Sequence, residues 1–211
     1  MDEHLQEVAI ELTDAAIDTL TDSELVKEIP VVGTLVRLAK ATHSISDRIF
    51  AKKVETFISG TKPVPEEKRA AFHAALEADP ALRRRAGQAV VLAIDRADDL
   101  QKTAIIGQLY SRFVTQEIPF ETLRRLLIAV DRAFIEDLLN FPAWVLQQRA
   151  PDTFDPRSLD GTGLVEPEYA RFGDIRVSET AAPKFGYSNL DLCEASSRIR
   201  AGLNQLMSQP A

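Results

Sequence analysis

The residues best suited to chemistry lie in a short pattern that occurs twice. Leu92-Ala-Ile-Asp-Arg-Ala97 and Ile128-Ala-Val-Asp-Arg-Ala133 share an apolar–Ala–apolar–Asp–Arg–Ala order, and further acids come after each copy. Carboxylates from two helices of a bundle can hold a divalent metal ion between them. The candidate metal ligands are Asp95, Asp98, Asp131 and Glu136. Because neither copy carries the Glu-x-x-His motif of bundle metal sites, surface or interhelical ion pairs explain these residues better, and we expect no metal and no other cofactor.

Other catalytic arrangements find little support in the sequence. His73 and Glu77 lie four residues apart on a predicted helix, which gives two metal ligands where zinc needs three or four. The sequence contains no Gly-x-Ser-x-Gly nucleophile motif and no glycine-rich nucleotide-binding motif. We therefore expect no catalytic residues and a protein that is not an enzyme.

Clusters of arginine suggest a surface that contacts phosphate or a partner. The candidate contact residues are Arg83, Arg84, Arg85, Arg124 and Arg125, with Arg171 and Arg176 further along the chain. Consecutive arginines on a helix point in different directions, so they form a broad patch rather than a clamp. Solvated arginines paired with nearby acids explain the same residues, and the net charge of −7 favours that interpretation because an acidic protein repels nucleic acid.

Charge is distributed unevenly along the chain. Residues 1–30 carry a net charge of −8 (one base, nine acids), and residues 31–62 carry +4 (six bases, two acids). The difference predicts that the first helix packs against, or shields, the basic second one.

Composition indicates a soluble, cytoplasmic protein. Hydrophobic residues make up 45% of the 211 residues and charged residues 27%, as in ordinary globular proteins. The single cysteine, Cys193, suits a reducing compartment, and the acidic first residues do not resemble a secretory signal. No apolar run approaches the ~20 residues that span a bilayer. Residues 29–38 are apolar and then basic, so peripheral membrane contact stays an alternative to burial in the core.

Helical periodicity dominates residues 1–148, which we predict to form one array of about six helices. The expected helices cover residues 4–20, 35–58, 65–78, 79–97, 101–113 and 118–138. In the second of these we expect Ile49, Val54 and Phe57 to face inward, and the last runs through Leu126 and Phe134. Asp79-Pro80 is a typical helix start, with an aspartate cap before a proline.

Residues 149–211 have a different composition and form a predicted small α+β tail. Prolines and glycines are frequent in 150–187, and two short extended pieces, 163–169 and 174–178, suit a β-hairpin. A last helix is expected over 189–206. The predicted fold class is therefore mainly α, with a C-terminal hairpin and helix.

The order of these pieces resembles the end of a winged-helix domain. A short helix near 155–159 precedes Gly163-Leu-Val, a hairpin comes next, and Tyr187-Ser-Asn-Leu190 leads into a closing helix. The array before it, notably Ile29-Pro-Val-Val-Gly33 and Ile118-Pro-Phe-Glu-Thr-Leu123, is similar to uncharacterised helical proteins of bacterial and prophage genomes. The first resemblance implies a DNA-binding tail, and the second implies a role in phage–host conflict.

The sequence favours one functional hypothesis over three others. A non-enzymatic interaction module comes first, with another protein or a second copy of the chain as its partner. A DNA-associated regulator that uses the tail, with Arg171 and Arg176 on the hairpin, comes second. A peripheral membrane effector and an enzyme with a carboxylate-held metal are the remaining alternatives.

Overall fold

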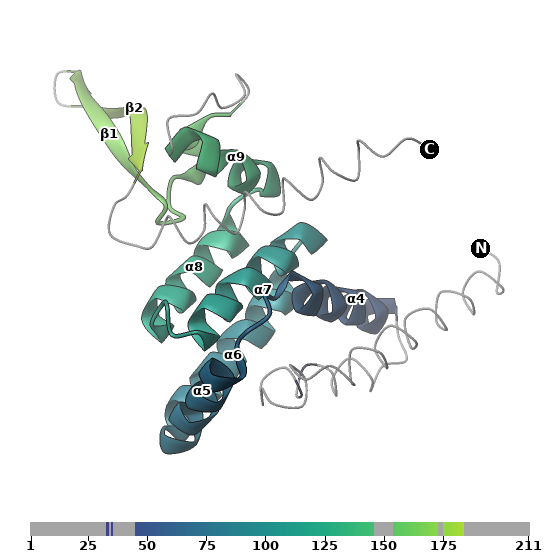
Figure 1. Cartoon of the computed structure of the whole chain (residues 1–211). Coiled ribbons are helices and arrows are strands. Elements are labelled where there is room, and N and C mark those ends of the chain that lie inside the picture. Colours follow the sequence, from purple (N-terminus) through teal and green to yellow (C-terminus); the bar gives the residue numbers. More distant parts are fainter. Residues whose placement is uncertain (1–32, 34, 36–44, 146–153, 173–174, 184–211) are drawn as a thin grey trace, which may run out of the picture. The chain divides into compact units, whose positions relative to one another are not determined.

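The computed structural model describes residues 33, 35, 45–145, 154–172 and 175–183. The chain divides into two compact units, residues 1–117 and 118–211. The described residues contain six α-helices, one 3-10 helix and two strands (Figure 1), which confirms the prediction of a mainly α-helical protein. No helix in these ranges is long and apolar enough to cross a membrane. The predicted boundary at residue 148 and the predicted first and last helices lie outside the described residues.

The first unit contains α4 (Ile45–Gly60), α5 (Glu66–Ala78), α6 (Pro80–Arg96) and α7 (Leu100–Val114). The predicted stop at 59–65 separates α4 from α5. Asp79 caps α6 as predicted: its carboxylate accepts a 2.9 Å hydrogen bond from the Leu82 N–H, and Pro80 takes the first helical position. That position tolerates proline because its N–H has no partner within the helix. Local capping chemistry thus determines where α6 starts.

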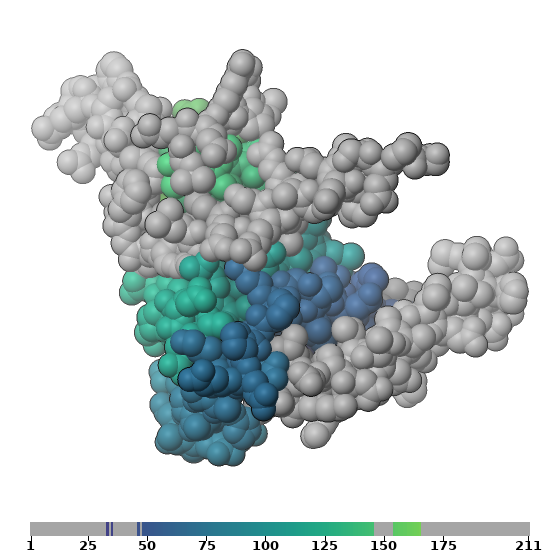
Figure 2. Space-filling model, in the orientation of Figure 1, coloured from purple at the N-terminus to yellow at the C-terminus, as the bar shows by residue number. Residues whose placement is uncertain are grey.

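The central helix of the first unit is α7. It contacts α4, α5 and α6, whose surfaces appear in shades of blue in Figure 2. Every residue from Lys102 to Ser111 is buried, so this helix has no solvent-facing stripe along that length. The hydroxyl of Ser111 donates to the Gly107 carbonyl at 3.1 Å and accepts from the Lys62 N–H at 2.8 Å, which satisfies a buried polar group.

Two glycines allow α4 and α7 to approach very closely. A Cβ added at Gly107 would lie 2.2 Å from the Phe57 carbonyl oxygen, and one added at Gly60 would lie 2.5 Å from the Ala104 oxygen. Real Cβ atoms are not found so close to backbone atoms, so no other residue fits either position without moving a helix. The contact is extended by the rings of Phe57 and Tyr110, whose centroids are 5.6 Å apart.

The expected inward orientation of Ile49 is wrong. Its side chain is 54% exposed, whereas Ala51, Val54 and Phe57 on the same helix are buried. Ile49 lies five residues before Val54, and five residues rotate the side-chain direction by roughly 140° around an α-helix. It therefore lies near the opposite side of α4 from the buried stripe.

The second unit contains α8 (Phe120–Arg132), α9 (Ile135–Val145), η1 (Pro156–Leu159), β1 (Val165–Phe172) and β2 (Ile175–Pro183). The strands pair antiparallel, with a register irregularity between Glu168 and Tyr169. Aromatic rings connect α9 to the segment before η1, because Trp144 lies 6.0 Å from Phe141 and 6.1 Å from Phe154 between ring centroids.

The expected single helix over 118–138 is also wrong, because the chain breaks it into α8 and α9. Ala133 has an extended conformation (φ −84°, ψ 150°), and its N–H makes the last bond of α8, to the Ala129 carbonyl. The Leu138 N–H then bonds the Phe134 carbonyl at 3.1 Å to begin α9. Phe134 stands at the junction with 68% of its surface exposed.

Candidate interaction surface

The repeated Asp-Arg-Ala pattern ends a helix in both places. Helix α6 ends at Arg96 and α8 at Arg132, and the alanine after each arginine leaves the helical conformation. In each copy the N–H of that alanine bonds the carbonyl four residues earlier. A new helix begins within four residues of both breaks. The pattern is therefore a repeated helix ending, which gives the duplicated residues a structural role.

Burial also matches between the two copies, which stand 36 residues apart. Ile94 and Val130 are both fully buried, at 0% exposed. Two positions earlier, Leu92 is 50% exposed and Ile128 is 40% exposed. The same place in each copy thus presents a large apolar side chain to solvent.

Asp98, the first residue after Ala97, forms an ion pair. The Asp98 carboxylate lies 2.6 Å from the Lys102 Nζ, whose side chain is only 2% exposed. The hydrogen bond from Lys102 holds the pKa of Asp98 below its ordinary value, against a smaller opposing effect of burial. Asp98 therefore stays ionised and compensates the charge of Lys102. A buried lysine needs such a partner, because an unpaired charge in the protein interior is strongly unfavourable.

The candidate metal ligands do not form a cluster within the part of the chain that the structure describes. Groups of three or more His, Cys, Asp or Glu side chains close enough to hold an ion do not occur there. Asp95 and Asp98 belong to the first unit, and Asp131 and Glu136 to the second. The backbone carbonyl of Asp95 accepts a 2.7 Å hydrogen bond from the Lys53 Nζ, so this stretch supports the contact between α4 and α6.

The predicted arginine clusters lie on different helices and strands. Arg83, Arg84 and Arg85 are exposed near the start of α6 in the first unit. Arg124 and Arg125 are exposed on α8 in the second, where Arg124 lies 4.0 Å from Glu121. Arg171 and Arg176 occupy directly opposite positions in the register of β1 and β2. Only this last pair is joined by strand pairing.

Two of the basic residues of 31–62 make contacts of their own. Lys52 pairs with Glu55 at 2.8 Å, and Lys53 bonds the carbonyl of Asp95. The acidic residues 1–30, expected to shield this region, lie outside the described residues. In the apolar segment 29–38, Leu35 is fully buried, at 0% exposed.

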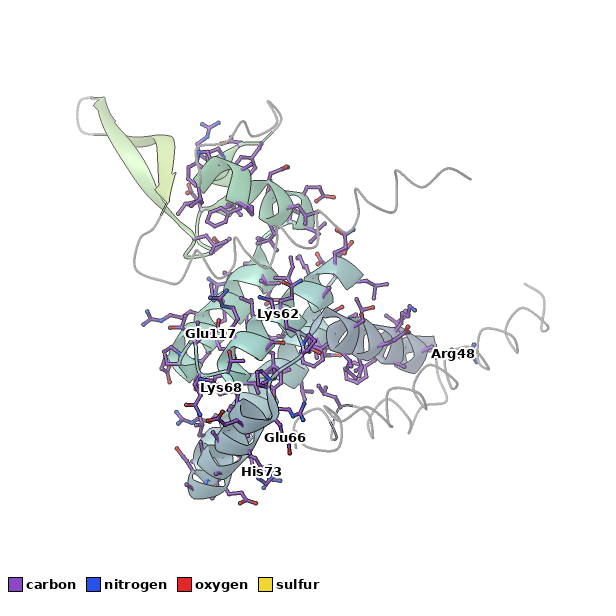
Figure 3. All side chains as sticks on the ribbon, viewed as in Figure 1. Arg48, Lys62, Glu66, Lys68, His73 and Glu117 are labelled. Atoms are coloured by element: carbon purple, nitrogen blue, oxygen red, sulfur yellow. The ribbon has the colours of Figure 1, made fainter. Side chains whose placement is uncertain are left out.

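His73, labelled in Figure 3, lies on α5 beside Glu77, with 3.6 Å between its Nδ1 and the Glu77 Oε1. Both side chains are substantially exposed, so this is a polar pair on a helix surface. Tyr110 differs, because it is buried between Phe57 and Phe113 and burial strongly raises the pKa of its phenol. Its hydroxyl has no hydrogen-bond partner in the described ranges, and the phenol stays neutral at physiological pH.

A small hollow in the second unit was not expected from the sequence. Its volume is about 100 Å³, and residues of α8 and of the turn before β1 line it: Arg125, Leu126, Ile128, Ala129, Thr162, Gly163 and Leu164. The turn is fixed by positive φ angles at Gly161 (78°) and Gly163 (87°) and by a 2.9 Å hydrogen bond from Arg132 to the Gly161 carbonyl. The two glycines flanking Thr162 were the only sequence signal of this turn, and Arg125 was the only lining residue predicted to contact a partner.

The described residues define a mainly α-helical protein with a repeated helix ending and exposed apolar side chains. No protein-family model matches the sequence, and neither the curated proteins nor the solved structures contain a match. The resemblances to winged-helix and prophage-encoded proteins therefore stay predictions.

Proposed function

We propose that the protein is a non-enzymatic interaction module that binds another protein, or a second copy of itself, through exposed apolar side chains. Exposed single apolar residues are ordinary on protein surfaces. The observation that carries the proposal is the exposure of two large apolar side chains of the second unit, the first of which is Ile128 on α8, 40% exposed. Phe134, at the junction between α8 and α9, adds a ring that is 68% exposed.

Aromatic and aliphatic side chains of this kind are the anchors of protein interfaces. Aromatic residues are enriched at interface centres, where their burial contributes most of the binding free energy. An exposed ring next to a helix start, such as that of Phe134, is suited to enter a partner without unfolding its own helix. The net charge of −7 also favours a protein partner over nucleic acid.

Native mass spectrometry of the untagged protein, purified from its own cells, tests the proposal. We expect a mass above 23.4 kDa by that of a protein partner, or a whole-number multiple of it. Phe134→Ser should release the partner and return the monomer mass. Ile49→Ser is the matched control, because Ile49 is comparably exposed on a helix of the first unit. A wild-type protein found only as a monomer, or a partner retained equally by both variants, contradicts the proposal.

The register of the hairpin favours a second candidate, a DNA-associated regulator. Arg171 lies directly opposite Arg176 next to the end of the hairpin. Arginine is a common contact of DNA phosphates, and the strand register brings these two positions to one place on the hairpin. This candidate is weaker, because the chain as a whole is acidic.

Fluorescence anisotropy with labelled duplex DNA tests the second candidate at several salt concentrations. Binding should weaken steeply as salt rises, and Arg171→Glu with Arg176→Glu should abolish it. Arg83→Glu with Arg84→Glu, which reverses two exposed charges of the first unit, is the control and should leave binding unchanged. Equal binding by the hairpin variant would exclude the hairpin as the contact.

A further inference from the structure

We propose that the hollow beside α8 receives one aliphatic side chain from an acidic segment of the partner. This proposal rests on the proposed function and names the chemistry of the partner. The hollow lies wholly within the second unit, between α8 and residues 162–164.

The lining of the hollow suits an aliphatic group. Leu126, Ala129 and Leu164 provide a buried apolar floor, and Ile128 extends it to the surface with 40% of its own side chain exposed. An apolar cavity of ~150 Å³ is known to hold benzene. A hollow of about 100 Å³ is therefore matched to a smaller group, such as the side chain of leucine or isoleucine.

The charges beside the hollow suit an acidic partner. Arg125, Ile128 and Arg132 lie on one stripe of α8, because positions three and four apart share a helix face. Arg125 lines the hollow, and Arg132 donates to the Gly161 carbonyl at its edge. The Gly161 carbonyl is a neutral acceptor and does not cancel the positive charge of Arg132, which would attract a carboxylate of the partner. An acid next to the inserted residue would meet Arg132.

The corresponding stripe of α6 offers a matched control within the chain. Leu92 and Arg96 occupy the places of Ile128 and Arg132 in the first copy of the repeated pattern. Both are exposed, and neither lines the hollow. Equivalent substitutions at the two sites thus remove similar side chains, and only those on α8 should change binding.

Methyl NMR of the full-length protein, labelled at isoleucine and leucine methyl groups, is the experiment. The probe is a short synthetic peptide of glutamates around one leucine. We expect saturable shifts at the methyls of Ile128 and Leu164, and none when serine replaces the leucine of the peptide. Ile128→Ser should weaken binding about tenfold, and Leu92→Ser should have no effect. Arg132→Ala should weaken it about fivefold, and Arg96→Ala should not.

Several results would overturn the proposal. Equal shifts with the leucine and serine peptides would show that no side chain enters the hollow, and this comparison does not depend on the folding of any variant. Larger shifts of the Ile128 and Leu164 methyls with duplex DNA than with the peptide would assign the arginines to phosphate. If the peptide fails while a partner is still lost from Phe134→Ser, the hollow is excluded and the interaction function survives. Loss of both would overturn the proposed function itself.

Discussion

The helix pairs α6–α7 and α8–α9 share a helix ending but differ in the residues that come directly after it. Asp98 and Lys102 in the first pair correspond to Phe134 and Leu138 in the second, 36 residues later. Lys102 and Leu138 are both buried, at 2% and 0% exposed. The first pair therefore needs an acid in front of its buried cation, whereas the second leaves that position to an exposed aromatic ring. The same helix ending is thus followed by an internal ion pair in the first unit and by an aromatic ring exposed to solvent in the second.

Exchanging the buried residue should have the largest effect. Leu138→Lys places a cation in an apolar site with Phe134 in front of it, and we expect a loss of about 4 kcal/mol in the free energy of unfolding. Adding Phe134→Asp recreates the arrangement of Asp98 and Lys102 and should recover about 1–2 kcal/mol. Urea unfolding followed by circular dichroism measures both. A double variant no more stable than Leu138→Lys would show that the matched positions are not equivalent.

A substitution at the close approach of α4 and α7 should have the next largest effect on stability. Gly107→Ala makes the position like Ala143, its counterpart in α9. The added Cβ would meet the Phe57 carbonyl oxygen at 2.2 Å, so the helices must separate, at a cost of about 3 kcal/mol. The reverse change, Ala143→Gly, should cost only about 1 kcal/mol, through helix propensity. Thermal unfolding measures the loss of stability in each variant. Equal losses of stability would contradict the conclusion that Gly107, and not Ala143, lies at a tight helix crossing.

The ion pair of the first unit should give a smaller, pH-dependent effect. Asp98→Asn should cost about 1–2 kcal/mol at neutral pH, less than a fully buried pair would, because Asp98 is 68% exposed. The pKa of Asp98 is lowered in the folded protein, so its stabilisation is present above the ordinary value of 3.8. It is lost as the pH falls through the folded pKa.

Urea midpoints of the wild type and Asp98→Asn should therefore differ at pH 7 and converge at pH values below the ordinary aspartate range. A difference that is the same at both pH values would mean that the Asp98 charge does not act on Lys102. Asp155→Asn is a useful control, because Arg157 lowers the pKa of Asp155 in an exposed pair where little stability is at stake.

Local signals predicted much of the helical architecture. The cap at Asp79 and the Gly- and Pro-containing stretch at 59–65 act within a few residues, so the helix ends around them can be predicted from the sequence alone. The break at Ala133 could not, because alanine has the highest helix propensity and nothing near it marks a stop. The same pattern at Ala97 precedes Asp98 and Asp99, which signal a new helix, whereas Phe134 gives no such signal.

The candidate site was harder to predict, because it depends on contacts between distant residues. Periodicity predicts a buried Ile49, but it gives the direction of the buried face of a helix only approximately. The charge of Arg125 predicts a contact residue, but the hollow that it lines needs Thr162 and Leu164, more than 30 positions away. The duplicated acids are consistent with a metal site in the sequence, whereas in the structure one of them, Asp98, pairs with a buried lysine.

The glycine contact between α4 and α7 also has a consequence for how the first unit folds. It joins Phe57 to Gly107, which are 50 positions apart, whereas α5 and α6 are consecutive along the chain and pack through local contacts. Closing a long loop costs more chain entropy than closing a short one, and contacts of long sequence separation slow folding. The α5–α6 pair should therefore form early, and the closure of α4 onto α7 should set the folding rate.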